Sequence, residues 1–122
     1  MTTTRIKTQS VRLHRCTDPD FARQEALNLL WPLGHMPMIL EDDARRLLSY
    51  YLTAAALDGA GLDTIREWAA DQDDRRAVEL LRAGPLGWAD DCERILNLRG
   101  PYWSNILTAV RLALLPDRVR EA

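Results

Sequence analysis

The sequence contains neither of the glycine-rich patterns that bind nucleotide phosphates, G-x-x-x-x-G-K-S/T and G-x-G-x-x-G. These patterns matter because the backbone amides of such loops surround the phosphate oxygens. The only close glycine pair, Gly59 and Gly61, is not followed by a lysine. We therefore expect no ATPase activity in this chain.

Metal ligands and catalytic side chains are also few. The only histidines, His14 and His35, do not lie at metal-ligand spacing from a cysteine or an acid within one helix. Ser49 and Ser104 have no histidine partner that the spacing identifies, and adjacent carboxylates on a helix point about 100° apart. We expect a chain that is not an enzyme and that holds no metal and no cofactor.

Long apolar runs are absent, and cysteine occurs only twice, as Cys16 and Cys92. No stretch approaches the roughly 20 apolar residues of a membrane-spanning helix, and the polar first residues do not resemble a secretory signal. Two cysteines so far apart are expected to stay reduced. The sequence therefore predicts a cytoplasmic domain without direct membrane contact.

Charge is distributed unevenly along the chain, although the net charge is only −2. Residues 1–17 carry four basic side chains and no acid, whereas residues 58–93 carry ten acids against four bases. We expect residues 1–17 to form a loosely held basic arm. Its contacts with nucleic-acid phosphates would be weak, salt-sensitive and indifferent to sequence. The side chains that would make them are Arg5, Lys7, Arg12 and Arg15.

Beyond residue 18 the apolar residues recur with helical spacing almost everywhere, which predicts an all-α fold. Glycine, proline and aspartate separate the segments, so helices are expected over about 18–30, 41–58, 62–70, 74–83, 88–99 and 102–115. The strongest apolar stripe consists of Ala44, Leu47, Leu48, Tyr51, Leu52 and Ala55. Residues 5–15 alternate weakly, but a lone strand would have nothing to pair with. We predict a single compact bundle of about six short helices over residues 18–122, without a sheet.

Aspartates gather at the expected helix starts of the acidic middle segment. The residues concerned are Asp71, Asp73, Asp74, Asp90 and Asp91. Carboxylates at such places commonly cap helices, so one interpretation is capping and solvation. The other is a partner-binding surface, because a cap uses one carboxylate oxygen and the charge still faces outward.

Three stretches carry a resemblance to a known family. They are residues 11–26, with the turn Cys16-Thr17-Asp18-Pro19-Asp20 and an alanine-bearing helix, residues 44–70, and residues 103–122. Their order is similar to that of the all-α domain of actinobacterial TraG-type coupling proteins, the ATPases of conjugative type IV secretion. One departure is Glu41-Asp42-Asp43, which stands where the family often has an aromatic residue.

This resemblance implies a helical insertion in a nucleotide-binding domain whose phosphate loop lies upstream. In the family, the helical domain is associated with the choice of cargo, either relaxase-bound DNA or a protein substrate. The resemblance thus implies a cargo-recognition domain that contacts a relaxase or another secreted protein, within the cytoplasmic portion of a membrane-anchored parent. Secretion signals on such cargo are often arginine-rich tails, which would suit the five aspartates.

An alternative is a stand-alone helical DNA-binding regulator or a protein-interaction domain. A regulator needs exposed Arg, Asn or Gln side chains at the N-terminal end of a recognition helix. The best candidate helix, over 102–115, offers only Asn105 and Arg111. The sequence therefore favours the cargo-recognition hypothesis.

Overall fold

A computed structural model describes residues 8–34 and 38–122, and in this part of the chain the elements are mostly helical. Their order is β1 (Gln9–Val11), η1 (Leu13–Thr17), α1 (Pro19–Leu30), η2 (Trp31–Leu33), α2 (Met38–Asp58), α3 (Leu62–Ala70), α4 (Arg76–Leu81), α5 (Trp88–Leu96), α6 (Pro101–Ala113) and β2 (Val119–Glu121), where η marks a 3-10 helix. The predicted all-α bundle is confirmed, with helices close to the six expected ranges.

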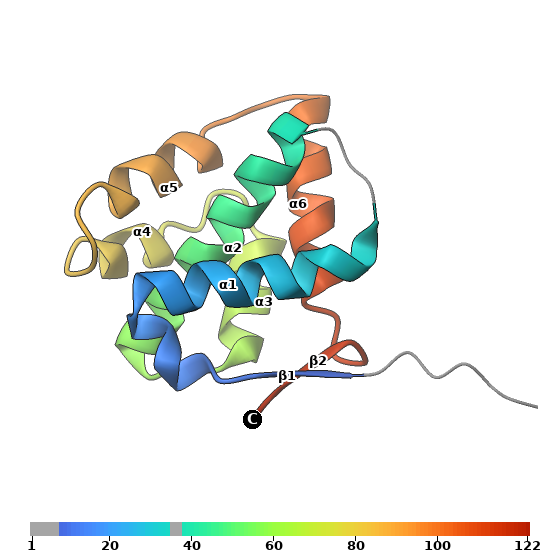
Figure 1. Ribbon diagram of the computed structural model, residues 1–122. Helices are drawn as coiled ribbons and strands as arrows, with labels where there is room; N and C mark the ends of the chain where they lie inside the picture. The colour runs from blue at the N-terminus through green and yellow to red at the C-terminus, as the bar shows by residue number, and fades with distance from the viewer. Residues whose placement is uncertain (1–7, 35–37) are drawn as a thin grey trace, which may run out of the picture.

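The long helix α2 runs through the middle of the bundle (Figure 1). It contacts each of the other five α-helices and also η1. In Figure 1, α1 crosses in front of α2, α6 lies on one side, and α4 and α5 lie on the other. Every surface helix therefore packs its apolar face against this central helix or against a neighbour of it.

Local sequence signals explain where several helices begin and end. The Asp18 side chain accepts a hydrogen bond from the Asp20 backbone amide, 3.0 Å away, and proline follows at the first position of α1. Gly100 adopts a positive φ of 86° just before Pro101, where α6 begins. Helix α2 begins at Met38, earlier than the predicted start, because no glycine or proline interrupts the sequence after Pro37.

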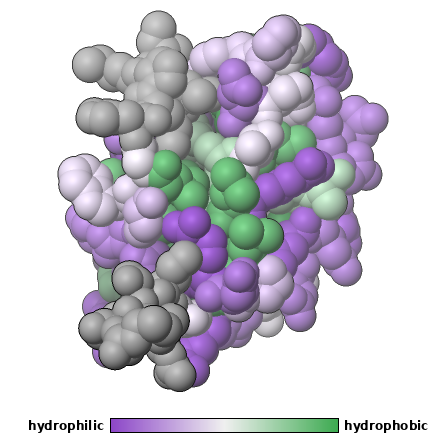
Figure 2. Space-filling view, turned by 90° about the vertical axis from the view of Figure 1, so that its right-hand side faces the viewer, coloured by the Kyte–Doolittle hydropathy of each residue, from purple (hydrophilic) through white to green (hydrophobic). Residues whose placement is uncertain are grey.

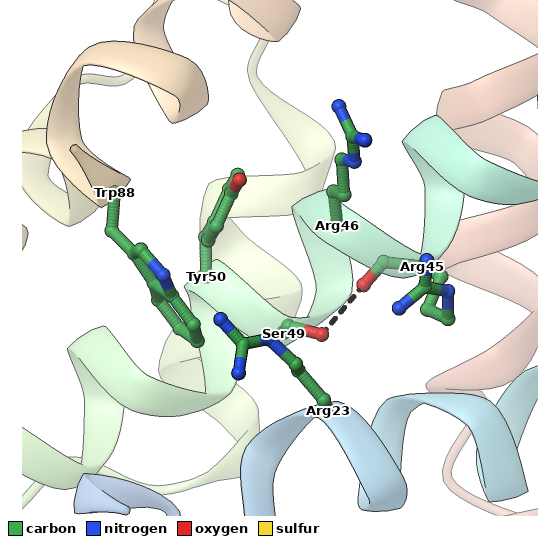
Figure 3. A pocket seen from close by; sticks show the side chains of 6 residues that line it. All are labelled: Arg23, Arg45, Arg46, Ser49, Tyr50 and Trp88. Carbon is green, nitrogen blue, oxygen red and sulfur yellow. Dashed lines mark hydrogen bonds between the residues drawn. The ribbon is translucent and has the colours of Figure 1, made fainter. Parts of the chain in front are cut away.

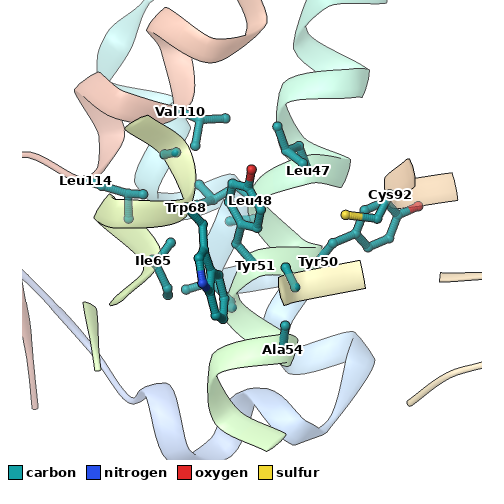
Figure 4. Packing of buried hydrophobic residues seen from close by; sticks show 14 of the residues in the cluster. Leu47, Leu48, Tyr50, Tyr51, Ala54, Ile65, Trp68, Cys92, Val110 and Leu114 are labelled. Atoms are coloured by element: carbon teal, nitrogen blue, oxygen red, sulfur yellow. The ribbon is translucent and has the colours of Figure 1, made fainter. Parts of the chain in front are cut away.

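The core consists of the apolar stripes that the sequence predicts. All six residues of the α2 stripe are fully buried, and so are Ile106 and Val110 of α6. Figure 4 shows Trp68 of α3 beside Tyr51 of α2, with their ring centroids 5.8 Å apart. Trp88 and Trp103 are also buried, whereas Trp31 is 77% exposed. Three of the four tryptophans therefore contribute to the core.

The prediction of no sheet was wrong in one respect, because β1 and β2 form a short parallel pair. Gln9 lies opposite Val119, and Val11 lies opposite Glu121. The two strands are separated by the whole helical bundle in sequence, so no local pattern could reveal the partner of β1. The pairing brings the two ends of the described chain to one side of the molecule (Figure 1).

The described part of the arm, residues 8–17, is also packed rather than loosely held. Val11, Leu13 and Cys16 are buried, and the Thr53 hydroxyl of α2 donates a hydrogen bond to the Cys16 carbonyl over 2.8 Å. Val11 is the inward-facing end of β1, and Leu13 and Cys16 are the buried residues of η1, so both elements pack on the core. In the described residues, no helix is long and apolar enough to cross a membrane.

Candidate functional site

The five predicted aspartates lie at opposite ends of α5. Asp90 and Asp91 are in its first turn. The connection that holds Asp71, Asp73 and Asp74 is tied instead to the residues just after α5. The Gln72 side chain donates to the Leu98 carbonyl over 3.0 Å, and Arg75 donates to the Asn97 side chain over 2.8 Å. The aspartates therefore form two acidic groups on one flank of the bundle.

Two of these aspartates are engaged by arginines and are partly buried. Asp74 accepts hydrogen bonds from the Arg76 backbone amide (2.9 Å) and from its guanidinium (2.7 Å). These bonds lower the pKa of the Asp74 carboxyl. Burial alone would raise the pKa of Asp91, but hydrogen bonds from Arg94 and Tyr50 lower it overall. The hydrogen bonds of Asp74 and Asp91 therefore stabilise the folded structure.

The other three aspartates, Asp71, Asp73 and Asp90, are exposed. The side chain of Asp71 accepts a hydrogen bond from the Asp73 backbone amide over 3.0 Å, which stabilises the turn before α4. Such a bond leaves the carboxylate charge facing solvent. Asp71, Asp73 and Asp90 are therefore the part of the predicted acidic surface that a partner could contact.

A buried acid, Asp43, links three helices. Asp43 of α2 is only 8% exposed and accepts hydrogen bonds from Arg94 of α5 (3.2 Å) and from Tyr102 of α6 (2.5 Å). Arg94 also donates to Asp91 over 2.7 Å, and the hydroxyl of Tyr50 donates to Asp91 as well. Asp43 lies one helical turn before Leu47 on the buried face of α2, and this position was the signal that it needs a partner.

The basic residues of the arm are only partly described. Arg5 and Lys7 lie outside the described residues. Arg12 and Arg15 are exposed, and the Arg15 guanidinium lies 4.4 Å from the centre of the Phe21 ring. Arg111, the candidate base-reading residue of α6, donates instead to the Ala69 carbonyl (2.9 Å) at the end of α3. Arg111 is therefore occupied within the fold, which weighs against α6 as a recognition helix.

A polar cleft that the sequence analysis did not predict lies between α1, α2 and the start of α5. Its volume is about 240 Å³. Its lining consists of Arg23, Arg45, Arg46, Ser49, Tyr50 and Trp88, which Figure 3 shows together. Arg23 reaches across from α1 so that its guanidinium lies 5.1 Å from the centre of the Trp88 ring. No sequence signal could locate this cleft, because its arginines come from two helices whose faces meet only in the folded chain.

Acids beside the cleft hold its arginines in place. Asp42 accepts from Arg45 over 2.6 Å and from Arg46 over 3.0 Å, so one carboxylate serves two guanidinium groups. Arg23 pairs with Asp20 over 2.8 Å, but the Asp20 side chain is 89% exposed. Tyr50 and Trp88 make an edge-to-face contact with ring centroids 4.9 Å apart and close one wall. The cleft is therefore an ordered, electropositive depression.

The cysteines are buried thiols, and the described residues hold no cluster of metal ligands. Both thiols are free and buried, and burial raises the pKa of Cys16 and of Cys92 to about 12. A thiol with so high a pKa carries almost no thiolate at neutral pH. Within residues 8–34 and 38–122, no group of three His, Cys, Asp or Glu side chains is arranged to hold a metal ion.

The α6 side of the molecule exposes apolar surface. Figure 2 shows apolar residues gathered in the middle of this face, with hydrophilic residues around them. Leu112 and Leu115, in α6 and just after it, are 42% and 39% exposed. Grouped apolar residues with a polar rim are common where proteins contact one another.

In comparisons with known proteins, no family model, curated protein or solved structure matches the chain. The likeness to coupling proteins therefore rests on the three sequence stretches alone.

Proposed function

We propose that this chain is a cargo-recognition domain of a TraG-type conjugative coupling protein. It would contact a relaxase or another secreted protein and would have no ATPase activity of its own. The observation that best supports this proposal is the pairing of β1 with β2. The Ala122 amide donates to the Val11 carbonyl over 2.9 Å, and the Gln9 amide donates to the Arg118 carbonyl over 2.8 Å. A helical domain inserted in a larger one needs its entry and exit close together, and this pairing provides that.

The surface proposed for the cargo is the acidic flank around α5. Asp71, Asp73 and Asp90 are exposed and suit an arginine-rich segment, because opposite charges raise the association rate of two proteins. The apolar face over α6 adds a second surface that a folded cargo could contact. Binding of DNA through Arg12 and Arg15 would be weak and would fall steeply with salt.

The test uses a short arginine-rich peptide as the probe and stopped-flow association kinetics as the readout. The variant D71N/D73N/D90N removes three exposed charges and preserves Asp74 and Asp91, which hold the fold. The matched control is E41Q/D58N/D117N, which removes the same charge from exposed acids elsewhere. At low salt we expect the first variant to associate about tenfold more slowly than the parent, while the control changes by less than about twofold.

Equal slowing in both variants would show that only net charge matters, and it would refute the acidic flank as the cargo surface. The same would follow if the peptide bound the first variant as fast as the parent.

A further inference from the structure

The cleft between α1, α2 and α5 has no part in the proposed cargo contact. Each of its three guanidinium groups makes a single carboxylate contact among the described residues, with Asp20 or Asp42. A guanidinium has five N–H donors, so most of these donors remain available. The side chains of Arg23, Arg45 and Arg46 are 48%, 32% and 44% exposed, so a solute can reach them.

The charge of the cleft is positive. None of its lining residues is acidic. Three carboxylates lie near the lining: Asp42 is shared by Arg45 and Arg46, the charge of the exposed Asp20 is largely screened by water and salt, and Asp91, beyond the Tyr50 hydroxyl, is paired with Arg94. In a protein whose net charge is −2, three arginines around one depression are a local concentration of positive charge.

The hydrogen-bonding character of the lining selects among anions. Its donors are the guanidinium groups, because the Ser49 hydroxyl donates its proton to the Arg45 carbonyl and the Tyr50 hydroxyl donates its proton to Asp91, which leaves these two oxygens as the only side-chain acceptors of the lining. A peptide C-terminus or an amino acid would also bring N–H groups that need acceptors, and the lining supplies few. A phosphate dianion brings only acceptor oxygens and matches guanidinium groups in shape and charge.

We propose that this cleft is a binding site for a phosphate dianion, either free or as the terminal monoester of a small molecule such as a mononucleotide. The volume of about 240 Å³ is below the range of about 300–1,000 Å³ found for drug-sized ligands, so the cleft takes one group rather than a large molecule. In Figure 3 the Arg23 guanidinium lies beside Trp88, whereas those of Arg45 and Arg46 point away from it, so these two exposed side chains turn toward the bound phosphate. Trp88 with Tyr50 forms the wall beside it. This proposal does not depend on the cargo-recognition function.

Titrations followed by two-dimensional NMR test the site, because the indole N–H of Trp88 reports on the wall of the cleft. The probes are inorganic phosphate, AMP and adenosine at constant ionic strength. We expect phosphate and AMP to shift the Trp88 resonance saturably and adenosine to leave it unchanged. Tighter binding of AMP would assign the site to a monoester, and equal binding would assign it to free phosphate; both results support the proposal.

The variant R46Q should weaken AMP binding at least about tenfold, since charge-assisted hydrogen bonds are the strong class. Arg82 provides the matched control, because it is a similarly exposed arginine that pairs with Glu79 outside the cleft. R82Q should bind AMP like the parent, and the unchanged dispersion of the spectrum verifies that each variant is folded. Equal weakening in R46Q and R82Q would overturn the proposal.

A nucleic acid is a third possible source of the phosphate group. Two single-stranded oligonucleotides, one with and one without a 5′-phosphate, test it. The phosphorylated form should bind more tightly. If the two oligonucleotides bound equally well and more tightly than AMP, the cleft would bind the phosphodiesters of the backbone, and the monoester proposal would be wrong.

Discussion

Replacing Leu52 by alanine tests whether the central helix is packed as described. Leu52 lies in the middle of α2 and is 0% exposed. Because α2 is enclosed by α1, α4 and α6, the surrounding helices cannot easily collapse into the void. Buried leucine-to-alanine changes cost about 2–5 kcal/mol, and the cost is highest where the cavity stays open. We therefore expect L52A to lose about 3–5 kcal/mol of unfolding free energy.

Urea unfolding followed by circular dichroism measures this loss. The denaturation midpoint should fall while the slope stays the same, since the surface exposed on unfolding hardly changes. The matched control is Leu86, a fully exposed leucine between α4 and α5, whose change to alanine should alter stability by less than about 0.5 kcal/mol. If L52A cost no more than L86A, the assignment of the buried face of α2 would be wrong.

Two further predictions concern arginine contacts. Arg111 donates hydrogen bonds to the carbonyls of Ala69 and Ala70 at the end of α3. R111Q should therefore lower the unfolding free energy, measured by urea denaturation, by about 1–3 kcal/mol. No change would mean that these two hydrogen bonds do not stabilise the fold. The second concerns pH. Arg76 lowers the pKa of the folded Asp74, so the stability contributed by Asp74 is present above its unfolded pKa of about 3.9 and is lost as pH falls below it. R76Q should therefore show a shallower loss of stability below about pH 4 than the parent, and equal slopes would contradict the assignment.

Much of the secondary structure could be predicted because its signals are local. Asp18 and Pro19 start α1, and Gly59 follows the end of α2 with a φ of 66°. The periodic stripes also identified the buried faces correctly, as Leu52 and Val110 show. Such patterns depend on residues within one or two helical turns of each other, so they can be recognised from the sequence alone.

The candidate sites were predicted much less well. The sequence identified the acidic residues but could not show that Asp74 and Asp91 are engaged by arginines while Asp73 and Asp90 face solvent. Arg76 and Arg94 also follow Asp73 and Asp90 by three and four residues, so spacing alone does not tell which aspartate of each pair is engaged. Side chains from other helices contribute to the difference. Tyr50, for example, reaches Asp91 across the contact between α2 and α5.

The sequence by itself determined the helical class, the approximate helix boundaries and the buried stripes, because hydrophobic period, capping and helix breakers act over short distances. Only the tertiary structure decided the pairing of β1 with β2, the burial of Asp43 between Arg94 and Tyr102, and the cleft that Arg23 of α1 lines together with Arg45 and Arg46 of α2. Each of these joins residues that are distant in sequence. Their positions depend on how whole helices pack, and packing angles are not encoded in any single segment.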